Sequence, residues 1–250
     1  MDLAFPGYTI TKPPNNFGNF SIYEARREDD QRSVFIKTPA SRYPSPAVIH
    51  QLELAYEVAK ELDPRLVLEP LSLERWAGNI ALVLENSACQ ALSNLLGTPM
   101  ETGRFLKIAI GAIEALAEIH RHSIVHKDVK PPNLYVDIGH EGHVRFSGFE
   151  IASRLPREHQ MLAPLEFIAG TLAYMAPEQT GRMNRSIDSR SDLYSLGITF
   201  YEMLTGSLPF FASDPMEWVH CHIARAAIPP AERLKDIPRP ISAIVMKLLA

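Results

Sequence analysis

Residues 126–133 read HKDVKPPN, and this stretch carries the most specific information in the chain. It combines a histidine, a carboxylate, a lysine and an amide within eight residues. Apolar residues at helical spacing predict a helix over 105–122, just before the stretch. Two short apolar runs follow it, at 134–136 and 144–146, and predict a hairpin. The stretch is therefore expected to form a loop between a helix and a hairpin.

The residue types in this loop suit phosphoryl transfer. Asp128 can orient a substrate hydroxyl, Lys130 can neutralise charge on a moving phosphoryl group, and Asn133 can offer an oxygen to magnesium. The run resembles the catalytic loop of protein kinases, H-R-D-x-K-x-x-N, and its second lysine is typical of serine/threonine kinases. A lone H-x-D would carry little weight, because structural loops often contain it, whereas the full run in this setting is specific.

Two runs in the first third of the chain resemble kinase motifs that bind ATP. Residues 34–37, VFIK, are similar to the kinase strand V-A-I-K, which implies that Lys37 holds the α- and β-phosphates. Residues 82–85, LVLE, resemble the strand that enters the adenine hinge. That resemblance implies that Glu85 and Asn86 lie beside the nucleotide.

Two runs in the last third resemble supporting kinase motifs. Residues 170–178, GTLAYMAPE, resemble the peptide-positioning loop, which implies hydrogen bonds from Thr171 to Asp128 and Lys130. Residues 191–197, SDLYSLG, resemble a buried helix start whose aspartate supports the catalytic loop. The residues that receive structural roles from the resemblance are His126, Phe149, Asp192 and Glu178, the last as partner of an arginine beyond residue 250.

The chain departs from the kinase pattern at 148–150, where GFE stands in place of D-F-G. Phe149 keeps the packing role, but Gly148 offers no carboxylate to Mg²⁺, which usually takes one or two from the protein. Magnesium binding is therefore expected to weaken. Glu150 could reach the metal beside Asn133, or it could be a solvated turn residue, and the second interpretation is the expected one.

Two other motifs are degraded. The family's glycine-rich loop is reduced to Gly18, one place out of position, while Phe17 and Phe20 stand at two of its glycine positions and are expected to pack under the sheet. Ala55 falls where the glutamate partner of the strand lysine belongs. Glu53 could substitute as an ATP-site residue, although the solvated face of an amphipathic helix is the simpler interpretation.

The expected architecture is α+β: a bilobal protein kinase-like fold with a small β-rich N-lobe and a larger helical C-lobe. The N-lobe is assigned to 1–86, a sheet with one helix, and the C-lobe to 87–250. The last apolar helix, 241–250, has no cap, so the chain is expected to be part of a longer protein and truncated before the last C-lobe helices. A cleft between the lobes is the expected ligand site.

The composition is that of an ordinary globular protein, with 250 residues, 46% of them hydrophobic and 22% charged. A net charge of −4 argues against nucleic acid and anionic membranes as partners. No signal peptide and no membrane-length apolar run are found, so a cytoplasmic protein without membrane insertion and with free thiols at Cys89 and Cys221 is expected. The run 220–222, HCH, is expected to be helix packing rather than a zinc site, because residues two apart on a helix diverge.

Residues 170–206 and 214–224 narrow the resemblance to the kinase-like front domain of very large bacterial signalling proteins. In that family an ATPase module, a GAF-type region and a sensor histidine kinase of the two-component type follow. The resemblance implies ATP with Mg²⁺ as cofactors, and a protein substrate or the downstream domains as partners. Three functions stay open: an active serine/threonine kinase with altered metal binding, a pseudokinase that regulates downstream domains, and an interaction scaffold. The retained catalytic-loop residues favour the first and Gly148 the second, and impaired transfer is the expected state.

Overall fold

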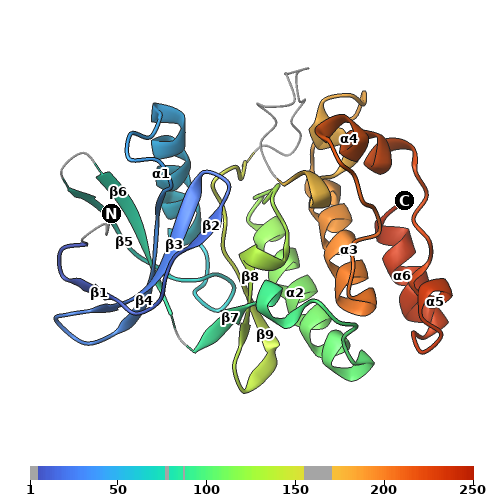
Figure 1. Ribbon diagram of the computed structural model, residues 1–250, viewed down its shortest axis with the longest axis horizontal. Coiled ribbons are helices and arrows are strands. Elements are labelled where there is room, and N and C mark those ends of the chain that lie inside the picture. The colour runs from blue at the N-terminus through green and yellow to red at the C-terminus, as the bar shows by residue number, and fades with distance from the viewer. Residues whose placement is uncertain (1–4, 77–78, 87, 155–170) are drawn as a thin grey trace.

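A computed structural model describes residues 5–76, 79–86, 88–154 and 171–250. A sheet-rich N-terminal part lies beside a helical C-terminal part (Figure 1), which confirms the expected α+β, bilobal architecture. The first sheet has the order β1-β3-β4-β6-β5, with β2 paired on β3, and all its pairs are antiparallel. Its strands are β1 (Tyr8–Ile10), β2 (Asn15–Phe17), β3 (Phe20–Arg27), β4 (Ser33–Pro39), β5 (Pro70–Trp76) and β6 (Asn79–Glu85).

Strand β4 shows how the sheet separates its two faces. Successive side chains of a strand point to opposite faces, so residues two apart share one. Val34 and Ile36 belong to a small apolar cluster on one face, with Ala25, Ala81 and Val83. Phe35 and Lys37 therefore lie on the other face, and Phe35 joins the main core, which runs on into the helical part. This face carries the residues that meet the C-lobe.

Helix α1 (Pro46–Lys60) packs on the sheet. Ser45 caps its N-terminus by accepting a hydrogen bond from the Val48 N–H, and Pro46 suits the first helical position. The residues buried on its inner face are Leu52, Ala55, Val58 and Ala59. Ala55 is thus part of the hydrophobic core.

The C-lobe consists of helices and a second, three-stranded sheet with the order β7-β8-β9. The long helix α2 contacts β9, and α3 contacts both α2 and α6. The elements are β7 (Cys89–Ala91), α2 (Thr102–Arg121), β8 (Leu134–Asp137), β9 (His140–Phe146), α3 (Ser189–Thr205), α4 (Pro215–Ala224), α5 (Pro230–Arg233) and α6 (Arg239–Leu248), with short 3-10 helices at Leu92–Leu95, Pro131–Asn133, Leu172–Tyr174 and Pro177–Thr180. The hairpin expected after the HKDVKPPN run is β8–β9.

One expected boundary shifts: the last helix, expected over 241–250, ends at Leu248. Strand β5 begins at Pro70, because residues 66–68 pair with the end of β9: Leu68 donates its N–H to the carbonyl of Phe146, and Phe146 donates to that of Leu66. Gly170 lies outside the described residues. Among the described residues, no helix is both long and apolar enough to span a bilayer.

Candidate active site

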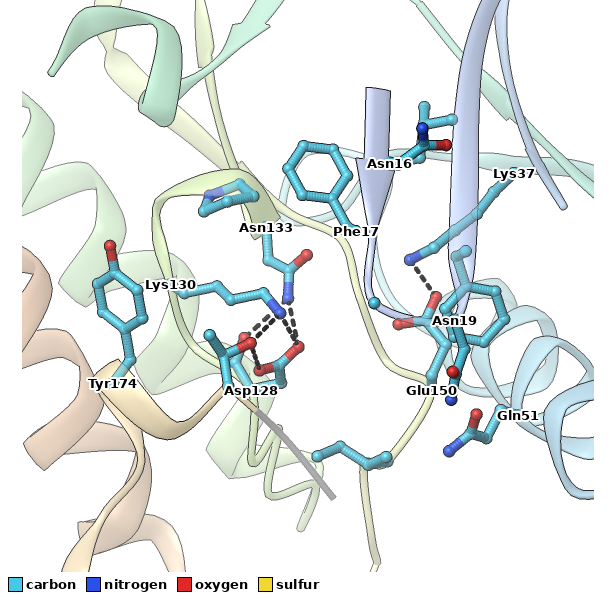
Figure 2. A pocket seen from close by; sticks show the side chains of 16 residues that line it. Asn16, Phe17, Asn19, Lys37, Gln51, Asp128, Lys130, Asn133, Glu150 and Tyr174 are labelled. Atoms are coloured by element: carbon cyan, nitrogen blue, oxygen red, sulfur yellow. Dashed lines mark hydrogen bonds and ion pairs between the residues drawn. The ribbon is translucent and has the colours of Figure 1, made fainter. Parts of the chain in front are cut away.

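Two neighbouring cavities lie between the lobes. The first, here called the lysine cavity, has a volume of about 420 Å³ and is lined by Lys37, Asp128, Lys130, Asn133 and Glu150 among others. The second, here called the hinge cavity, has about 450 Å³ and is lined by Phe35, Asn86, Cys89 and Tyr135 among others. Both cavities touch Phe17, Ile22 and Pro132, so these residues stand between them. Figure 2 shows the lysine cavity with Lys37 and Glu150 on one side and Asp128, Lys130 and Asn133 on the other.

The loop 126–133 is held from below by a buried carboxylate. Asp192, in the first turn of α3, has no exposed surface. Its two oxygens accept the backbone N–H groups of His126 and Lys127 at 2.8 and 2.7 Å, and one also bonds Nε2 of His120 at 2.8 Å. Lys127 adopts a φ of 66°, an unusual conformation for a residue with a side chain. The structural role expected for Asp192 therefore has a direct physical basis.

His126 links this loop to the segment after β9. Its ring is fully buried. Nδ1 accepts the N–H of Asp128 at 3.2 Å, and Nε2 donates to the carbonyl of Ser147 at 2.9 Å, which fixes the neutral tautomer. Burial lowers the pKa of His126 below its usual value, in keeping with a neutral ring. The ring of Phe149 lies 4.7 Å from that of His126, so Phe149 has the packing position that the sequence predicts.

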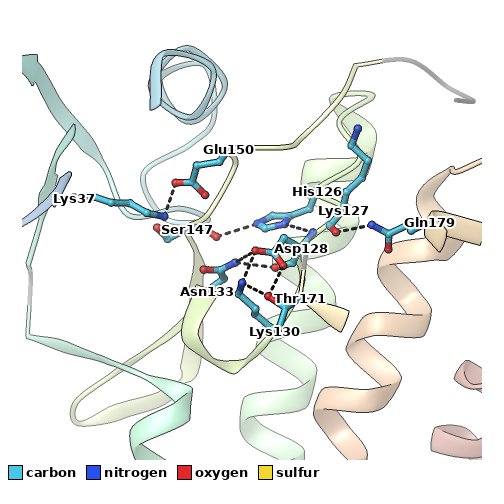
Figure 3. A network of polar contacts seen from close by, with 10 residues as sticks. All are labelled: Lys37, His126, Lys127, Asp128, Lys130, Asn133, Ser147, Glu150, Thr171 and Gln179. Atoms are coloured by element: carbon cyan, nitrogen blue, oxygen red, sulfur yellow. Dashed lines mark hydrogen bonds and ion pairs between the residues drawn. The ribbon is translucent and has the colours of Figure 1, made fainter. Parts of the chain in front are cut away.

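Asp128 lies at the centre of a polar cluster, shown in Figure 3. Its carboxylate is 2.6 Å from Nζ of Lys130 and accepts hydrogen bonds from Oγ1 of Thr171 at 3.2 Å and Nδ2 of Asn133 at 3.0 Å. Lys130 also donates to Oγ1 of Thr171. The contacts expected between Thr171 and these two residues are therefore present. The cluster places a carboxylate and an ammonium group side by side at the cavity wall.

Gly148 occupies a position that the local geometry reserves for glycine. Its φ is +91°, and a Cβ built there would lie 2.4 Å from both Cγ and Nδ2 of Asn133. The amide of Asn133 is thus packed directly against the Gly148 backbone. A residue with any side chain would need Asn133 to turn away and would strain the backbone.

Glu150 forms a buried ion pair with Lys37 (Figure 3). Only 7% of Glu150 and 4% of Lys37 is exposed, so the expectation of a solvated turn residue is wrong. The physical reason is that a buried ammonium group needs a counter-charge. Glu150 supplies it from the position directly after Phe149, whose ring packs on His126. Nζ of Lys37 also lies 5.2 Å from the ring centre of Phe20.

Glu53 is not the partner of Lys37, so the first of its two interpretations, a residue of the ATP site, is wrong. The carboxylate of Glu53 pairs with Arg75 and lies 3.6 Å from Nδ1 of His50, at the protein surface. The inner face of α1 carries Ala55, and residues two apart on a helix point in different directions. The second alternative, an amphipathic helix with Glu53 on its exposed flank, is what the structure shows.

The sheet side of the cleft differs from expectation at two places. Gly18 forms the turn between β2 and β3 with a φ of +56°. Phe20 is buried in the main core as expected, whereas Phe17 is half-buried and lines both cavities instead of packing under the sheet. Asn86 lines the hinge cavity, but the carboxylate of Glu85 accepts a hydrogen bond from Arg32 at 2.7 Å and contributes to neither described cavity.

The segment 176–180 supports the loop from the other side. Glu178 accepts a hydrogen bond from the hydroxyl of Ser191. Gln179, which the sequence did not single out, donates to the carbonyl of Lys127 at 2.7 Å and accepts the N–H of Ala176 at 3.1 Å. Its place directly after the A-P-E triplet was the only available signal. Gln179 thus ties the peptide-positioning segment to the catalytic loop.

The described residues contain no group of three or more histidine, cysteine, aspartate or glutamate side chains placed to hold a metal ion. His222, the buried histidine of the HCH run, accepts a hydrogen bond from the Tyr194 hydroxyl at 2.9 Å and donates to the carbonyl of Leu172 at 2.7 Å. Both ring nitrogens therefore make hydrogen bonds within the fold, which agrees with the helix-packing role expected for this run. Cys89 and Cys221 are buried free thiols.

An aromatic contact that the sequence did not single out lies in the cleft. The rings of Phe35, from β4, and Tyr135, from β8, have centroids 5.4 Å apart and planes inclined at 56°. Both residues line the hinge cavity, yet only 6% and 5% of them is exposed. The period of two along β4, which puts Phe35 on the face of Lys37, was a signal that could have located it.

The comparisons with known proteins agree with this architecture. A family model described as protein kinase domain matches residues 17–250, so the chain belongs to the protein kinase domain family. A serine/threonine-protein kinase PknB from Mycolicibacterium smegmatis is 35% identical over 152 residues, which cover 61% of this chain and 24% of that relative. PknB from Mycobacterium tuberculosis is 34% identical with the same coverage. A probable serine/threonine-protein kinase, CPE1738, from Clostridium perfringens is 36% identical over 58% of this chain and 20% of its own length. The chain is thus a protein kinase domain, and the matched stretches cover only about a fifth to a quarter of the length of these relatives.

Proposed function

We propose that this chain is a serine/threonine protein kinase domain in which phosphoryl transfer from ATP to protein hydroxyls is impaired. The support is a difference between two groups of side chains: those suited to phosphoryl transfer are in place, and those that would bind the metal are not. Asp128, Lys130 and Thr171 contact one another in an arrangement suited to transfer. The oxygen donors for a divalent metal, by contrast, are incomplete.

The groups around Gly148 fit magnesium poorly, and this observation carries the proposal. Mg²⁺ requires near-octahedral oxygen coordination and commonly takes one or two carboxylates besides phosphate oxygens. Gly148 has no side chain, and the amide of Asn133 contributes one neutral oxygen because its Nδ2 donates to Asp128. The carboxylate of Glu150 is paired with Lys37. Using Glu150 as the metal ligand would leave a buried lysine to find another anion, which is costly.

The remaining chemistry resides in the helical side of the cavity. A carboxylate held in place by hydrogen bonds from Thr171 and Asn133 can orient a substrate hydroxyl and take up its proton. Lys130, beside it, can neutralise charge on the transferred group. A divalent metal with ATP supplies the remaining charge neutralisation in kinases. With that contribution weakened, Asp128 and Lys130 retain a slow transfer at most.

We further propose that the domain serves as the front module of a longer, cytoplasmic signal-transduction protein and regulates the domains that follow it. The relatives that it matches extend well beyond the matched stretch, which covers 24% of the first. The buried free thiols of Cys89 and Cys221 suit a reducing compartment. The resemblance to kinase-like domains in front of sensor histidine kinases supplies the kind of partner.

A second candidate, an interaction scaffold that binds no nucleotide, is favoured by one observation. The cleft is divided into two cavities by Phe17, Ile22 and Pro132, whereas a nucleotide needs a continuous path from hinge to lysine. If the scaffold is correct, ATP does not change the melting temperature of the protein, with or without Mg²⁺.

Thermal unfolding and a transfer assay with labelled ATP separate these functions, with Lys37→Met as the control for phosphate binding. We expect ATP to raise the melting temperature slightly and equally with and without Mg²⁺, because a bound ligand stabilises the folded state. Transfer to a serine-rich protein substrate should barely exceed that of Asp128→Asn. A rise confined to Mg²⁺, with rapid transfer, would contradict the proposal in favour of an active kinase. No rise in any condition would support the scaffold.

A further inference from the structure

The contact between Phe35 and Tyr135 lies where a nucleotide base would enter the cleft. Phe35 is two residues before Lys37 on β4, and Tyr135 is two residues after Asn133, at the start of β8. A ligand whose phosphates reach Lys37 and whose base reaches the hinge at Asn86 must pass between these strands. Both rings line the hinge cavity and neither lines the lysine cavity, so they lie at the hinge end of that path.

The space between the rings is too narrow for a base. Carbon atoms in contact are about 3.5–4.0 Å apart, so a flat base between two rings needs them roughly 7 Å apart. The centroids of Phe35 and Tyr135 are 5.4 Å apart. Each ring already fills the place that a base would take against the other.

The burial of the two residues leads to the same conclusion. A side chain that stacks on a base presents an open face when the base is absent. Phe35 is 6% exposed and Tyr135 is 5% exposed, and both belong to the main apolar core. The desolvation that raises the pKa of the Tyr135 phenol reflects the same dry surroundings. No open apolar face of these two rings is left for a base.

The lysine cavity offers groups that suit phosphate. Lys37 and Lys130 line it together with Asn133 and Thr171, as do the carboxylates of Glu150 and Asp128 that pair with the two lysines. Ammonium and amide groups of this kind suit phosphate oxygens. The lysine cavity can therefore take phosphates, whereas the space between the two rings is filled and the hinge cavity is a separate space.

We propose that Phe35 and Tyr135 together close the base slot, so that the cleft recognises the polyphosphate group of a nucleotide and not its base. This inference rests on the proposed function, since it assigns the ligand class of the same cleft. It makes Phe35 a residue that determines specificity: a smaller side chain at this position opens the slot. The wild-type protein then treats ATP and inorganic tripolyphosphate alike.

The test compares ATP with inorganic tripolyphosphate by calorimetric titration of the full chain. In the wild type we expect the two dissociation constants to agree within about twofold, a difference of well under 1.4 kcal/mol. In Phe35→Ala, ATP should bind about tenfold more tightly, the effect of stacking one base, while tripolyphosphate is unchanged. Phe35→Val, which suits a strand better, is the second variant if alanine prevents folding.

A matched control separates loss of packing from opening of the slot. Phe105 packs on Phe200 with centroids 5.5 Å apart, and both are as deeply buried as the pair in the cleft, but they lie in the helical lobe. Phe105→Ala should lower the melting temperature without altering the ratio of the two affinities.

A wild-type preference for ATP of about tenfold or more would overturn the inference. So would a failure of both Phe35 variants to gain affinity for ATP, and so would the absence of tripolyphosphate binding in all variants. None of these results concerns the transfer rate. Rapid magnesium-dependent transfer would instead overturn the proposed function, so the two failures are distinguishable.

Discussion

On the helical side of the lysine cavity, the carboxylate of Asp128 has three partners, Lys130 and Asn133 from its own loop and Thr171 from a distant segment. The buried Asp192 holds the backbone of that loop. On the sheet side, Lys37 has the single carboxylate of Glu150, beside a turn where Gly148 has no side chain at all. The helical side follows the pattern of the kinase catalytic loop. The sheet side departs from the kinase pattern and pairs Lys37 with Glu150.

The difference shows that a catalytic-loop motif is in part a folding motif. Asp192 and His126 have no exposed surface and connect α3, the loop and the segment after β9. Loss of such groups leaves buried polar atoms without partners, which destabilises the fold whether or not the protein is an enzyme. Fold stability constrains the sheet side less, since any anion placed near Lys37 can balance its charge. Retention of the HKDVKPPN run is therefore weaker support for chemistry than the state of residues 148–150.

The largest effect should come from removing the support under the helical side. Asp192→Ala leaves two backbone N–H groups and His120 without their buried acceptor, and we expect it to lower the free energy of unfolding by roughly 3–5 kcal/mol. Urea unfolding followed by circular dichroism measures the loss. Asp63→Ala, which removes a surface pair with Arg65, is the control and should change little. If the two variants were equally stable, the loop would not depend on Asp192.

The next largest effect concerns the ion pair of Lys37 and Glu150 on the sheet side. Glu150→Ala strands a buried ammonium group at Lys37, and we expect a loss of roughly 3 kcal/mol. The double variant Lys37→Met with Glu150→Leu removes both charges and should recover most of that loss. A double-mutant cycle by chemical unfolding gives the coupling. Glu53 was the alternative partner that the sequence offered for Lys37, and Glu53→Ala should have little effect on the coupling between Lys37 and Glu150. Strong coupling of Lys37 to Glu53 instead of Glu150 would show that the pairing is wrong.

A smaller effect isolates the contact between the two sides, where Gly148 meets Asn133. Gly139→Ala places a Cβ at a φ of +95° with nothing nearby, so it should lose roughly 1–2 kcal/mol from backbone strain alone. Gly148→Ala has a similar φ of +91° and also meets the Asn133 amide, so it should lose more. The difference between the two unfolding free energies measures how firmly Asn133 is held. Equal losses would mean that Asn133 moves aside freely.

The sequence predicted the helical side well, because its motif residues are consecutive or lie at fixed spacing. The order of the lobes, the hairpin after Asn133 and the position of Asp192 all followed from periodicity and from the resemblance. Thr171 also takes the contacts expected of it.

The sheet side was predicted less well because its contacts depend on three-dimensional packing between segments far apart in the chain. Glu150 is 113 residues from Lys37, and no local pattern distinguishes a buried glutamate in a turn from a solvated one. The contact of Phe35 with Tyr135 likewise joins two strands that only the closed cleft brings together. The resemblance placed Ala55 at the position of the family's glutamate, and the structure buries Ala55 on the inner face of α1.

Lowering the pH should weaken the link between the two sides of the cavity that runs through His126. The neutral ring of His126 connects Asp128 to the carbonyl of Ser147, directly before Gly148. Burial lowers the pKa of His126 in the folded protein, so as pH falls the unfolded chain takes up the proton first. This contribution to stability is complete above the ordinary histidine pKa of about 6.5 and is lost below it, at up to about 1.4 kcal/mol per pH unit. Burial also lowers the pKa of His222, to about 4, so His222→Gln removes the share of a histidine remote from the cavity. We expect unfolding free energies measured from pH 7 down to about 5.5 to keep a residual slope in His222→Gln, to which His126 contributes. If His222→Gln abolished the slope altogether, the ring of His126 would not control the link between the two sides.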